Sequence, residues 1–303
     1  TFYMNLLHNL IYHPTINKLL RNINYVLSPI LPSKIKLYPT GKLKIRMDSV
    51  GSIYFKTNQT SFLTRELFWK GPEKFEFTKI FTKLIKKADV FIDIGANIGY
   101  YSILAGKFNP NIRVIAFEPS EGAMIYACEN VRINNLEDII KIEPLALFNK
   151  TGELDFYNVT NPKFSTIYNL SGEHNLTESK NKLKYAKVKT NGIKLDTYLK
   201  DVDLERIDLL KIDTEGSEYL ILEGAGKVLK KDRPIVICET LFNLIEEKLE
   251  SIFIELDYEF YNHSENGLVK VNSIQRKEDN GVRNCFFVPK EKVSLIKEFR
   301  FSN

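Results

Sequence analysis

The feature that most constrains the fold is an apolar run, residues 90–94, that ends in a glycine turn and continues as a helix over residues 98–107. The turn contains Gly95 and Gly99. Glycine is expected at the first position because a Cβ there would collide with a bound ligand, and at the second because helix and strand approach closely. A buried strand, a sharp turn and a helix form the opening unit of a doubly wound α/β fold.

Residues 73–303 continue this alternation of strands and helices, which predicts a mostly parallel sheet with helices on both faces. The last two apolar runs have no helical pattern between them and predict an antiparallel pair at the sheet edge. The polar insert 160–185 predicts a mobile surface loop between two further extended segments. The predicted strands are 90–95, 114–118, 139–146, 152–159, 186–192, 207–213, 234–239, 258–262 and 284–288, and the predicted helices are 98–107, 120–134, 217–230 and one that ends at 255.

Residues 1–72 form a separate N-terminal elaboration in this interpretation. Residues 1–31 predict a helix, and residues 42–56 predict a hairpin with one wet face because polar and apolar side chains alternate there. The helix is expected to pack its apolar side on the body of the protein, and the alternative is a docking surface for a partner or a membrane face. No run reaches the roughly 18 apolar residues of a membrane span, and the features of a signal peptide are missing.

Charge and cysteine content exclude several classes of function. The net charge of +5 comes from scattered lysines rather than from a basic stripe with aromatic side chains, which argues against nucleic-acid binding. The cysteines Cys128, Cys238 and Cys285 are far apart and have no metal-like spacing. They predict free thiols in a reducing compartment and therefore favour the cytoplasm.

A second acid points to a nucleoside cofactor. Glu118 ends the second predicted strand, nineteen residues after Gly99, where a carboxylate can accept hydrogen bonds from both hydroxyls of a ribose. Asn97 and Tyr100 replace the small residues that a dinucleotide pyrophosphate needs, and Asp93 would repel that group. A cofactor with a sulfonium and an ammonium suits the turn better. A nicotinamide-dependent oxidoreductase and a non-catalytic nucleoside-binding protein remain the alternatives.

Three motifs resemble a known family. The run 93–101, Asp-Ile-Gly-Ala-Asn-Ile-Gly-Tyr-Tyr, resembles the cofactor motif of the FkbM family of S-adenosylmethionine-dependent methyltransferases, and 117–119 resembles its second motif. Residues 211–218, Lys-Ile-Asp-Thr-Glu-Gly-Ser-Glu, resemble its hallmark segment, and 234–239 its next strand. The resemblance covers about residues 73–245. It implies a seven-stranded, Rossmann-like methyltransferase sheet and O-methylation of a hydroxyl, often on a sugar of a glycan or glycolipid or on a natural product.

We expect the cofactor to contact both motifs and the end of the third strand. The turn and Asp93 would hold the methionine part, the two tyrosines would shape its pocket, Glu118 would bind the ribose, and Ala146 and Leu147 would line the adenine. The predicted cofactor-binding residues are Asp93, Gly95, Ala96, Asn97, Gly99, Tyr100, Tyr101, Glu118, Ala146, Leu147 and Asp213.

The predicted catalytic residues are Asp213, Glu239 and His263. The two acids follow strands at the sheet edge where open α/β folds place their sites. Glu239 could hold the acceptor hydroxyl, act as base or join Asp213 around a divalent metal, but with no histidine beside these acids we predict no metal site. His263 is a candidate base because an ordinary histidine pKa suits that role. By the same resemblance, Glu76 and Thr78 stand where they could reach the cofactor.

Overall fold

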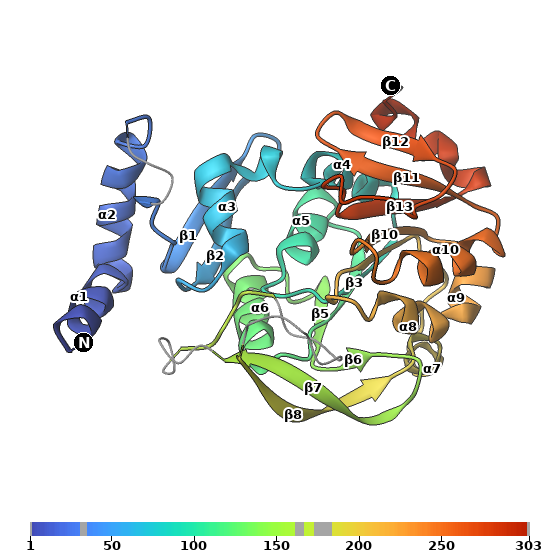
Figure 1. Cartoon of the computed structure of the whole chain (residues 1–303), viewed down its shortest axis with the longest axis horizontal. Helices are drawn as coiled ribbons and strands as arrows, with labels where there is room; N and C mark the ends of the chain where they lie inside the picture. The colour runs from blue at the N-terminus through green and yellow to red at the C-terminus, as the bar shows by residue number, and fades with distance from the viewer. Residues whose placement is uncertain (1, 31–34, 161–166, 173–183, 302–303) are drawn as a thin grey trace.

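The structure is a computed structural model and describes residues 2–30, 35–160, 167–172 and 184–301 (Figure 1). Its centre is an eight-stranded sheet with the order β12-β11-β13-β10-β9-β3-β4-β5. The five strands from β10 to β5 are mutually parallel, as predicted. All five residues of β3 are buried, which explains why four of them are apolar and leaves Asp93 as the one buried acid of the strand. The five strands are β3 (Val90–Ile94), β4 (Arg113–Phe117), β5 (Ile140–Glu143), β9 (Leu209–Ile212) and β10 (Ile235–Glu239).

The antiparallel edge of this sheet contains one strand more than predicted. Strand β13 (Asn284–Pro289) lies between β10 and β11 (Tyr258–Ser264), which confirms the expected antiparallel pair. Strand β12 (Gly267–Val271) follows a tight turn and pairs with β11, so the sheet has eight strands rather than seven. Cys238 and Cys285 are free, buried and opposite each other on β10 and β13, whereas Cys128 is free and exposed.

Helices cover both faces of the sheet, as the doubly wound prediction requires (Figure 1). The buried apolar side chains divide into two clusters, one containing Phe81 and Ile103 and the other containing Leu222 and Phe253. The predicted helix 217–230 is interrupted at Gly224 and forms two short helices. The helices around the sheet are α4 (Thr78–Leu84), α5 (Tyr100–Phe108), α6 (Glu121–Ile133), α7 (Leu195–Tyr198), α8 (Glu218–Glu223), α9 (Gly226–Lys231) and α10 (Glu246–Ile254), with 3-10 turns at Pro72–Lys74, Ile85–Lys87, Leu199–Asp201 and Lys290–Phe299.

A second, three-stranded sheet lies beside the central one. The predicted strand 139–146 ends at Glu143, after which the chain turns and β6 (Ala146–Leu147) pairs with β8 (Lys184–Ile193). Strand β7 (Gly152–Thr160) pairs with β8 along its whole length and forms the long arm at the bottom of Figure 1.

The N-terminal segment contains two helices instead of one. Helix α1 (Phe2–Ile11) is separated from α2 (Pro14–Val26) because His13 is extended and Pro14 begins a new helix. The predicted hairpin is confirmed as β1 (Gly41–Met47) and β2 (Gly51–Thr57), and α3 (Phe62–Lys70) follows it.

The hairpin is attached to the main domain through Asn130 of α6 and Asn134, the residue that follows this helix. Asn130 and Asn134 exchange hydrogen bonds with the backbone of Lys56 and Tyr54, at 2.6–3.3 Å. The predicted boundary between residues 72 and 73 stays a prediction. Within the described parts of the chain, no helix has the length and apolar character needed to cross a membrane.

Candidate active site

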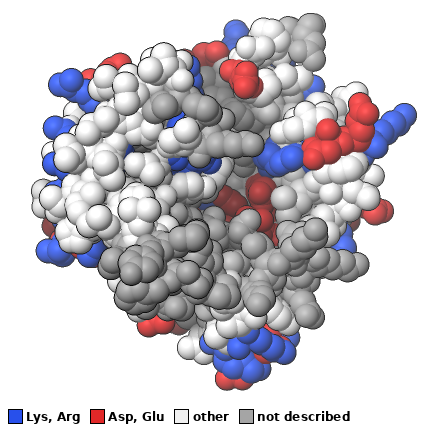
Figure 2. All heavy atoms as spheres, turned by 60° about the vertical axis from the view of Figure 1, so that its left-hand side comes forward, with Lys and Arg blue, Asp and Glu red and all other residues white. Residues whose placement is uncertain are grey.

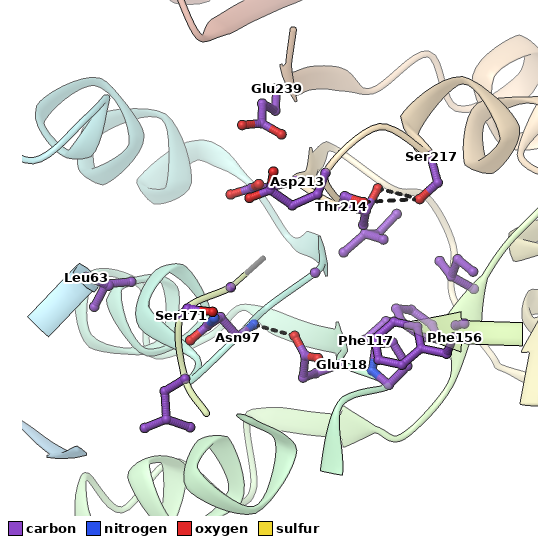
Figure 3. A pocket seen from close by; sticks show the side chains of 18 of the residues that line it. Leu63, Asn97, Phe117, Glu118, Phe156, Ser171, Asp213, Thr214, Ser217 and Glu239 are labelled. Atoms are coloured by element: carbon purple, nitrogen blue, oxygen red, sulfur yellow. Dashed lines mark hydrogen bonds between the residues drawn. The ribbon is translucent and has the colours of Figure 1, made fainter. Parts of the chain in front are cut away.

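A cavity opens at the carboxyl ends of β3, β4, β9 and β10, the place where open parallel sheets bind ligands. Figure 2 shows acidic side chains at the bottom of a hollow in the surface. The lining contains the carboxylate residues Glu76, Glu118, Asp213, Glu215 and Glu239. Figure 3 shows how several of these side chains converge from different strands.

The glycine turn after β3, which we call the Gly95 corner, contacts the ends of β4 and β9. Gly95 has φ +71°, and a Cβ built on it would lie 1.9 Å from the carbonyl oxygen of Asp213. Its N–H and that of Ala96 both donate to the carbonyl of Phe117, at 3.0 and 3.1 Å. The space that requires glycine is therefore occupied by the protein's own backbone. Gly99 has φ +84°, a left-handed conformation that favours glycine, at the start of α5.

Glu118 lies against this corner. One carboxylate oxygen accepts the N–H of Asn97 and the other accepts the N–H of Ser120, each at 2.8 Å (Figure 3). The residue is only 6% exposed, and this burial raises its carboxyl pKa to about 7 despite the two hydrogen bonds, which favour the ionised form. Each oxygen keeps a further lone pair that can accept a ligand hydroxyl.

An apolar slot adjoins Glu118. Phe117 and Phe156 lie next to each other in Figure 3, and both line the cavity together with Ala146 and Leu147. A flat heterocycle fits such a lining, because aromatic and aliphatic side chains remove its faces from water.

Three carboxylates gather on the other side of the cavity. An oxygen from each of Asp213, Glu215 and Glu239 lies within 4.8 Å of the others. Lys211 is buried beneath them, with its ammonium 3.2 Å from Asp213 Oδ2. A group of this kind attracts cations, and its oxygens are also the type that a divalent metal uses. The prediction that there is no metal site therefore lacks support from this geometry.

Glu239 is the carboxylate whose environment is least satisfied. Its Oε2 atom is buried and has no hydrogen-bond partner among the described residues. Burial, followed by the negative charges of Asp213 and Glu215, holds the pKa of Glu239 well above its ordinary range. Figure 3 shows its carboxylate directed toward Asp213.

The comparison with known families agrees with the sheet and its motifs. Residues 93–264 match the family model described as the methyltransferase FkbM domain. The chain belongs to this family. Among curated proteins, the FkbM chain is 30% identical over 163 residues to the methyltransferase sdnD of Sordaria araneosa, covering 45% of this chain and 60% of the relative.

Two further relatives carry similar names. The chain is 28% identical over 158 residues to the 2-O-methyltransferase NoeI of Sinorhizobium fredii, covering 50% of this chain and 63% of NoeI. These alignments span less than two thirds of either curated relative. A solved structure, the FkbM methyltransferase of Methylobacillus flagellatus, is 16% identical with a TM-score of 0.43, over 66% of this chain and 43% of that one.

Five of the eleven predicted cofactor residues of this FkbM chain are outside the cavity lining. Asp93 is buried, accepts a hydrogen bond from Ser102 at 2.6 Å and has Oδ1 3.7 Å from the Lys211 ammonium. The register places Asp93 directly opposite Lys211 on the next strand. The charge of Asp93 therefore faces the Lys211 ammonium, and the expectation that Asp93 holds the methionine part of the cofactor stays a prediction.

Both tyrosines of the motif are buried. The hydroxyl groups of Tyr100 and Thr78 share a hydrogen bond at 3.0 Å, and Tyr101 donates to Glu76 at 2.8 Å. Of the predicted cofactor residues, the cavity lining contains Gly95, Asn97, Glu118, Ala146, Leu147 and Asp213, whereas Asp93, Ala96, Gly99, Tyr100 and Tyr101 are outside it. A role of the last five in cofactor binding stays a prediction.

His263 is not brought to the cavity. It lies on β11, and β13 separates that strand from β10, which carries Glu239. Its ring packs edge-on against Phe77, and burial lowers its pKa to about 4. The expectation that His263 lies in the active site is therefore corrected, because β13 lies between its strand and β10.

Sequence reasoning missed part of the lining. Leu170, Ser171 and Gly172 cover the cavity, and they belong to the insert that was expected to be a mobile loop. Within residues 167–172, the Leu170 N–H donates to Thr60 at 2.8 Å, and Leu170 is buried. The remainder of the insert, with His174, lies outside the described residues. The available signal was the short run Ile167-Tyr168-Asn169-Leu170, which is more apolar than the stretch around it.

Proposed function

We propose that this chain is an S-adenosylmethionine-dependent O-methyltransferase that acts on a hydroxyl of a sugar, glycan or related metabolite. The observation that carries the proposal is the charge of the cavity. Glu118 can bind a ribose, while Asp213, Glu215 and Glu239 form an acidic wall that suits a cationic sulfonium and ammonium. The same wall would repel the pyrophosphate of a dinucleotide, so the nicotinamide alternative is disfavoured.

Each part of the donor has a matching group of residues. Glu118 would accept the ribose hydroxyls, and the slot of Phe117, Phe156 and Leu147 would enclose the adenine. The backbone of the Gly95 corner would contact the methionine part. S-adenosylmethionine supplies a methyl group that is already activated by its positive sulfur, so the protein mainly positions the acceptor.

Glu239 is the residue that we assign to the acceptor. A hydroxyl that becomes methylated must lose its proton, and an unpartnered carboxylate with a raised pKa is suited to accept it. Asp213 would position the acceptor or the donor, because its side chain lies between Lys211 and Glu239. The similarity to NoeI, which is named a 2-O-methyltransferase, supports oxygen as the methylated atom.

A two-stage experiment tests this proposal. In a thermal-shift assay, S-adenosylmethionine and S-adenosylhomocysteine at 100 times their dissociation constants should each stabilise the protein by about 2.7 kcal/mol, and NAD should not. Stabilisation by NAD alone would contradict the proposal. Radiolabelled methyl transfer to a panel of sugars and glycans should then yield S-adenosylhomocysteine and a methyl ether. Donor binding without transfer to any hydroxylated acceptor would leave the non-catalytic alternative as the better account.

A further inference from the structure

Helix α2 has its polar side inward and its apolar side outward. Asn17, Arg21 and Asn24, at positions i, i+4 and i+7, are buried. The series Leu19, Ile23 and Val26 has the same spacing two residues later, about 200° around the helix, and is exposed by 63%, 50% and 76%. An ordinary surface helix of a globular protein has the opposite arrangement.

Hydrogen bonds fix the helix in this orientation. Arg21 donates to the carbonyls of Thr40 and Lys42, at 3.0 and 3.2 Å. Asn17 donates to the carbonyl of Tyr38 and accepts the N–H of Thr40. Turning the apolar side inward would break these bonds and leave buried polar groups unpaired, which costs more than it gains. The hydrogen bonds of Arg21 and Asn17 therefore hold the apolar side of α2 outward.

The exposed apolar side chains continue beyond α2. We define the N-terminal apolar face as Leu7, Leu10, Leu19, Ile23, Val26, Leu27 and Ile30, each at least 41% exposed. Figure 1 shows α1 and α2 at one side of the molecule, beyond the hairpin. An apolar surface of this extent marks a binding site on a soluble domain.

The stretch of sequence that contains this face has charged side chains of a single sign. Residues 1–47 contain no aspartate or glutamate, whereas they contain seven basic residues: Lys18, Arg21, Lys34, Lys36, Lys42, Lys44 and Arg46. This segment alone exceeds the net charge of +5 of the whole chain. Lys44 and Arg46 line a groove together with Tyr25 and Val26 of α2, so basic side chains border the apolar face directly.

We propose that the N-terminal apolar face docks on an anionic membrane surface. In an anionic bilayer the apolar side chains of this face can contact hydrocarbon while the basic side chains beside it contact lipid phosphate. A second copy of the chain fits less well, because a two-fold interface would place two strongly basic segments against each other. Tyr25 stacks on Trp69 of α3 beside the face, and such aromatic rings favour the membrane–water boundary.

Helix α3 connects the face with the cavity. Phe68 and Trp69 at one end contact Tyr25, while Phe62 and Leu63 at the other end line the cavity. The helix has nine residues and is therefore about 13 Å long. Docking would hold the cavity near the bilayer, which favours an acceptor carried on a membrane lipid. The preference for a lipid-borne acceptor depends on the proposed function, whereas the docking proposal is independent of it.

Vesicle flotation of the full chain tests the docking proposal. The protein should float with vesicles that contain phosphatidylglycerol and much less with phosphatidylcholine alone. The double variant Ile23→Ser, Val26→Ser and the double variant Lys44→Gln, Arg46→Gln should each weaken binding roughly tenfold or more. Ile254→Ser, which removes an exposed isoleucine of α10 (60% exposed), is the matched control and should bind like the wild type.

Two results would overturn the proposal. One is a folded wild-type protein that does not float with vesicles containing phosphatidylglycerol. The other is a dimer in sedimentation velocity that the Ile23→Ser, Val26→Ser variant converts to monomer, since the face would then join two copies. Thermal unfolding and the S-adenosylhomocysteine shift of each variant establish that it is folded. If the protein binds the vesicles but not the donor, the proposed function is refuted and the docking proposal stands.

Discussion

The two halves of the cavity differ in how the chain builds them. The half that we assign to the donor takes Gly95 and Asn97 from the turn after β3 and Glu118 from the end of β4, which belong to two consecutive motifs. To the acceptor half we assign Glu239 from the end of β10 and Leu63 from α3, which line the same cavity but are far apart in the sequence. Motifs therefore encode the donor half locally, and only the folded sheet brings the acceptor half together.

The halves also differ in how their acids are satisfied. Glu118 has a backbone N–H on each oxygen, so its carboxylate is held in place for binding. Glu239 has a buried oxygen without a partner among the described residues, beside two other carboxylates. We therefore expect changes at Glu118 to affect donor affinity and changes at Glu239 to affect turnover.

The largest effect is expected from Glu239→Gln. The amide keeps the shape of the side chain but cannot accept the acceptor proton, so kcat should fall by roughly 10²–10⁴-fold. The dissociation constant for S-adenosylhomocysteine, measured by calorimetry, should stay within about threefold of the wild type. Glu247→Gln, an exposed acid on α10, is the control. Unchanged turnover in Glu239→Gln would remove this residue from the acceptor half.

The next effect is expected from Glu118→Ala. Loss of the charged acceptor for the ribose hydroxyls should weaken donor binding by roughly 10–100-fold, since each hydrogen bond to a charged group contributes about 1.5–3 kcal/mol. At saturating donor, kcat should change little. A donor affinity equal to that of the wild type would contradict the division between the two halves.

A pH dependence should sharpen the role of Glu118. Its carboxyl pKa is about 7 in the folded protein against an ordinary value of 4.5, so the folded state binds an extra proton between these values. Stability of the unliganded protein should therefore fall as pH rises from 4.5 to 7 and level off above 7. Because the ribose hydroxyls bind the ionised form, donor affinity should show the opposite trend and weaken below pH 7.

Thermal unfolding of the unliganded protein measures the stability trend, and calorimetric titration with the donor measures the affinity trend, each across this pH range in wild type and in Glu118→Gln. The variant should lose the pH dependence of affinity. A slope that persists in Glu118→Gln would assign the titration to another acid of the cavity.

The smallest effect is expected from Leu63→Ala. This side chain lines the cavity and we assign it to the acceptor half, so removing its apolar contact should raise the acceptor KM by roughly three- to tenfold without changing donor affinity. Initial rates at varied acceptor concentration measure the change. A weaker donor affinity with an unaltered KM would place Leu63 on the donor side instead.

The parallel strands and the donor half were predictable because their signals are local. An apolar run, a glycine that must take φ +71° and a downstream acid are all visible as residue types in order. The surroundings of Asp93 and His263 could not be predicted, because they depend on neighbouring strands that are far away in the sequence. Asp93 lies opposite Lys211, 118 positions later in the chain, and the strand order separates His263 from Glu239.

The missed strand β12 had a local signal after all. Ser264 pairs with Gly267, so Glu265 and Asn266 form a two-residue turn followed by apolar residues that alternate with polar ones. The orientation of α2, with its polar face inward, could not be predicted from local sequence. Its periodicity defines two faces, but only the bonds of Arg21 to β1 and the segment before it decide which face turns inward.

A crystal structure with S-adenosylhomocysteine tests the central claim most directly. The account predicts the ribose hydroxyls on Glu118, the adenine against Phe117 and Leu147, and the amino-acid end beside the Gly95 corner. It also predicts that the sulfur faces the carboxylates of Asp213 and Glu239. A ligand bound elsewhere, with Glu118 still holding only the N–H groups of Asn97 and Ser120, would contradict it.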